Sequence, residues 1–308
     1  MKKQGSLLIS KKSLLLITAV LILAAGAGYA LWRNNNQPSG QSAKPNATKY
    51  VSLNDGYLFS IPAKYTVDEI ANRGVAVVSS QDITTPPSAK NLDELYSSGA
   101  VTVQPVKQLK NSDAKTFKDY ATNTVAADLR KTMNSGSDVK FSKKGDIDAV
   151  EVFAIQNDGT RLRSAYLLNL SQPVMVVAKE ESDAFKIVRS SLEDLNKTNL
   201  KPDIDLAAQA AKTVVEMLRR QDNSGIRSQG TTDFNKNVTK DQLAANLSSS
   251  ATYLDRSITV VGGSYDGKVF IAQLAFEPKT KDEVPVSGVL SLSKQGKNWK
   301  LDGFQLPK

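Results

Sequence analysis

The chain of 308 residues contains no cysteine and no histidine. It therefore forms no disulfide, no thiolate zinc site, no Ser-His-Asp triad and no histidine-ligated haem. Thiol chemistry and imidazole acid–base catalysis are excluded for the same reason. The two absences remove most of the common catalytic and metal centres, and the folded regions must be stabilised by their apolar cores alone.

Several binding motifs are missing as well. The sequence has no glycine-rich phosphate loop, no Walker pattern and no dinucleotide fingerprint. Asp203 and Asp205 precede a predicted helix, where carboxylates complement the positive end of the helix dipole. Asp146 and Asp148 supply too few oxygen ligands for a metal ion. We therefore expect no cofactor, no metal and no enzymatic activity.

The positive charge of the chain is unevenly placed. The formal net charge is +9, and five of the 40 basic residues fall in residues 1–33, which contain no acid. The rest of the chain, residues 34–308, contains 35 basic and 31 acidic residues. An excess of +4 over some 275 residues is too small to indicate nucleic-acid binding.

One uncharged stretch of twenty residues, Ser13–Trp32, follows four lysines and precedes Arg33. At about 1.5 Å per residue, a helix of this length crosses a hydrocarbon core roughly 30 Å thick. The excess of lysines before the stretch places the N-terminus in the cytoplasm. We predict a basic cytoplasmic tail at 1–12, a transmembrane helix at 13–33, and an extracytoplasmic location for everything that follows.

A cleaved signal peptide is the alternative interpretation of the same stretch. It has an apolar run at Leu14–Ala25, followed by small residues at Ala25-Gly26-Ala27 and around Gly28 and Ala30. Cleavage there would release a secreted protein. The full apolar length and the aromatic end at Trp32 favour retention as an anchor.

Residues 34–49 are rich in Asn, Gln, Pro, Ser and Gly and show no apolar periodicity. Such a segment buries too little apolar surface to offset the entropy lost on ordering. We predict a flexible linker between the membrane segment and the first folded domain.

The region 50–198 alternates strand and helix patterns. Tyr57, Phe59 and Ile61 share one face of a predicted strand, and residues 117–133 carry apolar side chains every four positions. Further strands follow, two of them joined by a hairpin at residues 157–160. A helix that buries Phe185 and Val188 ends the region. The pattern predicts an antiparallel sheet covered by helices.

Two sequence segments of this region resemble PsbP-like domains: DGYLFSIPAKYTV at 55–67 and VMVVAKEESDAFKIVRSSLEDL at 174–195. The resemblance covers roughly 150 residues. It implies a PsbP-like α+β sandwich, and members of that family are mostly non-catalytic binding or assembly modules.

The region 203–308 begins with helices and ends with strands. A wide apolar stripe predicts the first helix, and Thr239 with Gln242 predicts a capping box at the start of a later one. The residues of the stripe are Leu206, Ala207, Ala210, Ala211, Val214, Val215 and Leu218. Four strands are predicted at 257–261, 269–276, 285–293 and 299–306.

Helices followed by a curved antiparallel sheet resemble the nuclear transport factor 2-like, or cystatin-like, cone fold. The sequence segments that carry the resemblance are Phe234–Leu247 and LSLSKQGKNWKLDGF at 290–304. The resemblance covers about 100 residues and implies a cone that encloses a pocket. Some relatives use this pocket for catalysis.

Five aromatic residues of the second region are candidates for lining that pocket: Tyr253, Phe270, Phe276, Trp299 and Phe304. The same side chains would equally form an ordinary hydrophobic core. Asp255 and Asp302 lie at the ends of predicted strands, where turn or surface roles are expected.

The sequence thus predicts an α+β protein: an N-terminal transmembrane helix, an antiparallel PsbP-like sandwich at 50–198, and a curved-sheet cone at 203–308. We expect a membrane-anchored, extracytoplasmic, non-catalytic binding or assembly protein of the bacterial cell envelope. It would contact the membrane through Ser13–Trp32 and bind an envelope protein, but no nucleic acid. The alternative is a small-ligand carrier or enzyme that uses the pocket of the cone.

Overall fold

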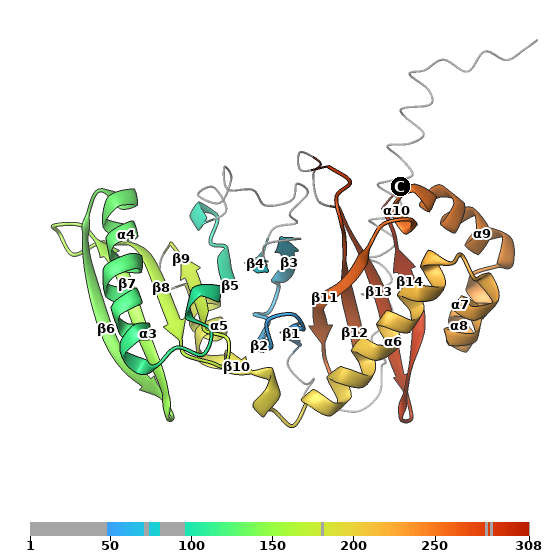
Figure 1. Cartoon of the computed structure of the whole chain (residues 1–308), viewed down its shortest axis with the longest axis horizontal. Helices are drawn as coiled ribbons and strands as arrows, with labels where there is room; N and C mark the ends of the chain where they lie inside the picture. Colours follow the sequence, from blue (N-terminus) through green and yellow to red (C-terminus); the bar gives the residue numbers. More distant parts are fainter. Residues whose placement is uncertain are drawn as a thin grey trace, which may run out of the picture. The chain divides into compact units, whose positions relative to one another are not determined.

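The computed structural model describes residues 48–70, 74–80, 96–179, 182–280, 283 and 286–307. They form an α+β structure with two antiparallel sheets, which we name sheet A and sheet B (Figure 1). The predicted basic tail, the segment Ser13–Trp32 and the linker up to residue 47 lie outside the described residues.

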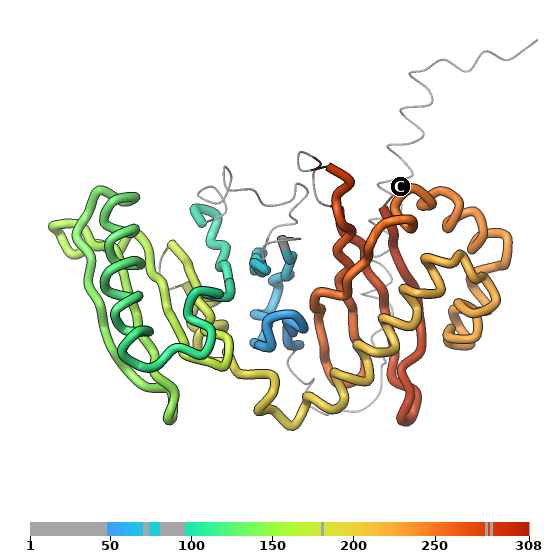
Figure 2. The backbone as a smooth tube through the Cα atoms, in the orientation of Figure 1, coloured from blue at the N-terminus to red at the C-terminus, as the bar shows by residue number. Residues whose placement is uncertain are grey.

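Sheet A joins strands from both ends of the described chain. The β1–β2 hairpin lies between a short strand, β10, and the four C-terminal strands, and the blue and orange segments adjoin in Figure 2. In spatial order the strands are β10 (Glu193–Asp194), β2 (Tyr57–Ser60), β1 (Lys49–Ser52), β11 (Ile258–Tyr265), β12 (Val269–Phe276), β13 (Val286–Gln295) and β14 (Asn298–Gln305).

Sheet B is formed by the middle of the chain. Its outer strands are β3 and β6, and all neighbouring strands are antiparallel. In spatial order the strands are β3 (Thr66–Ile70), β4 (Val75–Ser79), β5 (Val101–Pro105), β9 (Val174–Ala178), β8 (Arg161–Leu168), β7 (Ile147–Ile155) and β6 (Gly136–Lys144).

Helices cover a face of each sheet. A continuous helical segment packs on sheet B; its parts are α3 (Ala114–Tyr120), a π-helical turn (Ala121–Val125) and α4 (Ala126–Met133). The helices that pack on sheet A are α6 (Lys201–Arg219), α7 (Asn223–Gln229), α8 (Thr232–Asn237), α9 (Lys240–Ser249) and α10 (Ala251–Leu254). The predicted capping box of α9, Thr239 with Gln242, is confirmed.

The β1–β2 hairpin is buried on both faces because its side chains alternate between two cores. Tyr50 and Phe59 belong to the core between the two sheets, to which α5 (Asp183–Ser191) also contributes. Val51 and Leu58 belong to the core between sheet A and its helices. Successive side chains of a strand point to opposite faces of the sheet, so one hairpin contributes to two hydrophobic cores.

The predicted fold class, which divides an α+β chain into a separate sandwich and a separate cone behind a membrane helix, is wrong. The structure is α+β with two antiparallel sheets, and within the described ranges no helix is both long and apolar enough to cross a membrane. Strands β1, β2 and β10, which lie in the segment expected to form a separate sandwich, pair within the sheet of the expected cone. Periodicity did not reveal this, because the pairing of β1 with β11 joins residues about 200 positions apart.

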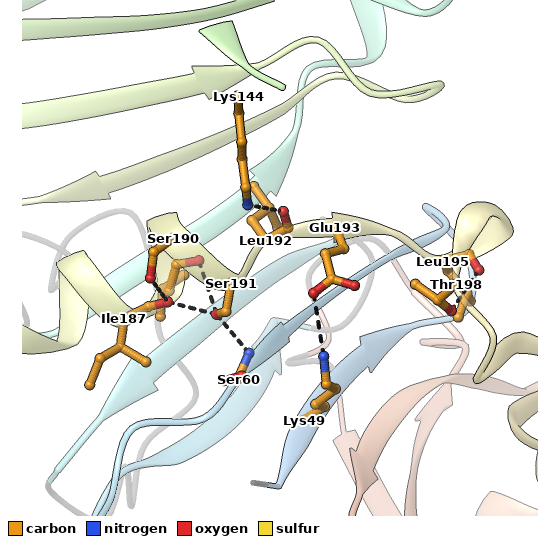
Figure 3. A network of polar contacts seen from close by, with 11 residues as sticks. Lys49, Ser60, Lys144, Ile187, Ser190, Ser191, Leu192, Glu193, Leu195 and Thr198 are labelled. Atoms are coloured by element: carbon orange, nitrogen blue, oxygen red, sulfur yellow. Dashed lines mark hydrogen bonds and ion pairs between the residues drawn. The ribbon is translucent and has the colours of Figure 1, made fainter. Parts of the chain in front are cut away.

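A polar network at the end of α5 connects elements of both sheets (Figure 3). Lys144 of β6 donates a hydrogen bond to the carbonyl of Leu192 at 2.6 Å. The hydroxyl of Ser191 accepts a bond from the amide of Ser60 in β2 at 2.9 Å. Burial lowers the pKa of Lys144. These bonds fix the chain as it leaves α5 and enters β10, so the network has a structural role.

Candidate functional site

A surface groove lies between α6 and the turn that joins β13 to β14. Its volume is about 390 Å³. It is lined by Leu206, Gln209, Ala210, Thr213, Gln229, Lys297, Asn298, Trp299 and Lys300. We name it the α6–β14 groove. Three separate elements build it, since Gln229 ends α7 and the last four residues lie on the turn and on β14.

Helix α6 supplies one wall through residues that share a helical face. Leu206, Ala210 and Thr213 follow each other at spacings of four and three, which places them one above the other. The sequence predicted Leu206 as part of the buried stripe, and this was wrong, because its side chain is 50% exposed. The stripe that packs on sheet A is centred on Ile204, Ala211 and Leu218, well over a quarter turn around the helix from Leu206.

Asp203 connects α6 to sheet A through Trp299 of the groove and two neighbouring residues. Its carboxylate accepts hydrogen bonds from the hydroxyl of Tyr265 at 2.6 Å, the indole nitrogen of Trp299 at 3.4 Å and the ammonium of Lys294 at 2.7 Å. Partial burial raises the pKa of Asp203, but the bonds from Lys294 and Tyr265 outweigh it and lower the pKa overall. This carboxylate is held ionised by three donors and serves to position Trp299.

The bond between Tyr265 and Asp203 can be tested with a matched pair of variants. We expect Tyr265→Phe to lower the free energy of unfolding by about 1 kcal/mol, because the hydroxyl bond is lost while the ring keeps its packing against Trp299. Tyr253→Phe is the control, since within the described chain the Tyr253 hydroxyl has no hydrogen-bond partner. Equal urea denaturation midpoints for the two variants would contradict a structural role of this bond.

The five predicted pocket residues lie in different surroundings. Phe270 and Phe276 are fully buried, and the ring of Tyr253 meets Phe276 edge-on at 6.2 Å between centroids. Phe304 lies beside Phe234, with 6.3 Å between the ring centroids. Trp299, although 4% exposed, lines the α6–β14 groove. Of the five, Trp299 is the residue that the structure places at this groove.

Asp255 and Asp302 also have defined positions. Asp255 caps the end of α10. Asp302 lies within β14, where it accepts a hydrogen bond from the hydroxyl of Ser293. Burial raises the pKa of Asp302. Neither residue is among those that line the groove.

A second polar cluster, which the sequence analysis did not find, lies between the sheets. Glu69 of β3 accepts a hydrogen bond of 2.5 Å from the hydroxyl of Tyr50 in β1. Burial raises the pKa of Glu69 to about 7. The hydrogen bond from Tyr50 lowers this pKa, but by less than burial raises it. Asp55, half-buried nearby, has its pKa raised by burial as well. The only available signal was the short strand Thr66–Ile70, in which Glu69 shares a face with buried Val67.

The Glu69 cluster can bind and release a proton but offers little room for a substrate. Tyr50 and Tyr57 are 0% and 1% exposed, and the position of a β-carbon built on Gly262 would lie 3.3 Å from a carboxylate oxygen of Glu69. No group of three or more Asp or Glu residues able to hold a metal ion occurs in the part of the chain that the structure describes. The Glu69 cluster therefore affects the stability of the folded protein.

Comparison with protein-family models gives no match for this chain, and comparison with curated proteins gives none.

Proposed function

We propose that this chain is a non-catalytic binding or assembly protein of the bacterial cell envelope. It acts on the extracytoplasmic side and is attached to the membrane through the uncharged segment Ser13–Trp32. The kinship with PsbP-like and cone-fold domains is part of this proposal, and it fits a binding role because PsbP-like domains are mostly binding modules.

The α6–β14 groove is the observation that supports a binding role most directly. It is open to solvent and combines an exposed leucine, Leu206, with an aromatic residue, Trp299. Contact sites on protein surfaces are enriched in aromatic side chains, and exposed apolar surface rimmed by polar groups marks such sites. A shallow groove of this kind suits a protein partner better than it suits a reaction, which needs groups that exclude water.

The state of the acidic residues also favours binding over catalysis. Asp203, the carboxylate bonded to Trp299 of the groove, is occupied by three hydrogen-bond donors. Glu69 has the raised pKa that a general acid needs, but it lies between the two sheets among buried tyrosines. A carrier or enzyme that uses the interior of the cone is less well supported, because Phe270 and Phe276 are fully buried members of the core between sheet A and its helices.

Site-specific photo-crosslinking in intact native cells tests the proposal. We expect a photoreactive amino acid at position 206 of the full chain to give one discrete protein adduct in the membrane fraction. The same amino acid at exposed Lys131 on α4, away from the groove, should give none. The extracytoplasmic location is tested in spheroplasts, where added protease should reach and degrade the folded region. A protected folded region, or identical adduct patterns from the two positions, would overturn the proposal.

A further inference from the structure

We infer that the α6–β14 groove binds an acidic peptide segment of a partner protein, with one bulky apolar side chain seated against Leu206 and carboxylates facing Lys297 and Lys300. The inference rests on the proposed function, because it names the chemical class of the partner for the same groove. Two properties of the groove carry it: the position of its apolar surface and the balance of charge around it.

The apolar surface is positioned to receive a side chain. Leu206 is half-exposed although it lies on α6, the longest helix that packs on sheet A in the described chain, and Ala210 one turn later has too small a side chain to cover it. Trp299 lines the same groove, although it is 4% exposed, and is held in place by its bond to Asp203 and by the ring of Tyr265 at 6.1 Å. The uncovered Leu206, in a groove that also includes this fixed aromatic residue, is a suitable contact for an aliphatic or aromatic anchor.

The lining of the groove carries positive charge from two lysines, and the acids of α6 do not oppose it because each is paired with another cation. Asp205 pairs with Lys201 at 2.6 Å and Asp203 pairs with Lys294 at 2.7 Å. Glu216, further along α6, pairs with Arg219 at 3.6 Å. The nine residues that line the groove include two lysines and no carboxylate.

The two lysines of the groove remain available. Lys300 donates to the main-chain carbonyl of Ser228 at 3.1 Å, so its charge is not neutralised by that contact. Lys297 lies in the exposed turn between β13 and β14 and has no ion-pair partner within the described residues. Asp302 is on the same strand as Lys300, but it is half-buried and bonded to Ser293. An acidic segment thus complements the groove, and a basic one is repelled.

The experiment is a titration of a fluorescein-labelled peptide against the full chain in a neutral detergent, followed by fluorescence anisotropy. The probe alternates glutamate with leucine over seven residues, and a control peptide carries lysine in place of each glutamate. We expect saturable binding of the acidic peptide that weakens as salt is added, and no saturable binding of the basic peptide.

Two variants connect the binding to the groove. We expect Lys297→Glu to weaken binding of the acidic peptide by about tenfold, since one attractive charge becomes repulsive. Leu206→Ser should weaken it by about fivefold through lost apolar contact. Both positions are exposed, so the variants keep the fold, which circular dichroism checks. Lys131→Glu is the matched control and should bind as the wild type does.

The outcomes separate this inference from the proposed function. Equal binding of the acidic and basic peptides, or an unchanged affinity in Lys297→Glu, overturns the inference. If position 206 still crosslinks to one partner in cells, the groove binds a protein of other chemistry and the proposed function stands. If position 206 gives no adduct either, both fail.

Discussion

We expect Glu69→Gln to remove a loss of stability that the wild-type protein suffers as the pH rises from about 4.5 to about 7. The ordinary pKa of a glutamate is 4.5, and burial raises the pKa of Glu69 to about 7 in the folded protein. Between these two values the folded state holds one proton more than the unfolded state. The contribution of Glu69 to stability therefore falls as the pH rises through this range and is constant above it.

The size of the effect follows from the difference between the two pKa values. Two and a half pKa units correspond to about 3 kcal/mol, which is a large fraction of the stability of an ordinary domain. Glutamine cannot ionise, and its amide oxygen can still accept the bond from Tyr50. We therefore expect the variant to match the wild type near pH 4.5 and to exceed its free energy of unfolding by about 3 kcal/mol at pH 8.

Urea denaturation of both proteins at several pH values between 4 and 8 measures the effect. Other groups titrate in both proteins, including Asp55, so the difference between the two curves is the quantity to compare. Glu277→Gln, at an exposed position, is the matched control and should run parallel to the wild type. If the curve of Glu69→Gln also runs parallel to the wild type, Glu69 does not hold its proton in the folded state.

The second large effect is expected from Gly262→Ala, which tests whether β1 is an integral strand of sheet A. Gly262 lies opposite Ser52 in the pairing of β11 with β1. A β-carbon at this position would lie 2.3 Å from the carbonyl oxygen of Val51 and 3.1 Å from the hydroxyl of Tyr50. Main-chain atoms cannot give way locally at such a distance, so β1 would have to move away from β11.

We expect Gly262→Ala to lower the free energy of unfolding by about 3 kcal/mol, since the displacement disturbs the hairpin in two cores at once. Gly303→Ala in β14 is the matched control, because nothing lies within 4 Å of its added methyl group and its backbone is not in the left-handed region. Thermal or urea unfolding compares the two. Equal midpoints would mean that β1 is not tightly paired with β11.

Local patterns predicted much of the secondary structure. The hairpin at 157–160, the helix over Phe117 to Met133 and the capping box at Thr239 are confirmed, because each depends on residues within a few positions of one another. Leu206 shows the limit of such patterns: an apolar residue at the margin of a helical stripe is buried or exposed according to the neighbouring element. Glu69 shows another limit, since one acid in a short strand gives no sign of what the strand faces.

The sequence alone determined the α+β composition of the protein, the positions of most helices and strands, and the absence of cysteine and histidine chemistry. These properties are set by side-chain type and by spacings of two, three and four residues. Only the tertiary structure decided that the β1–β2 hairpin joins the C-terminal strands, that Glu69 meets Tyr50, and that Leu206 and Trp299 share a groove. Each of these depends on contacts between residues distant in the chain, which the packing of whole elements selects.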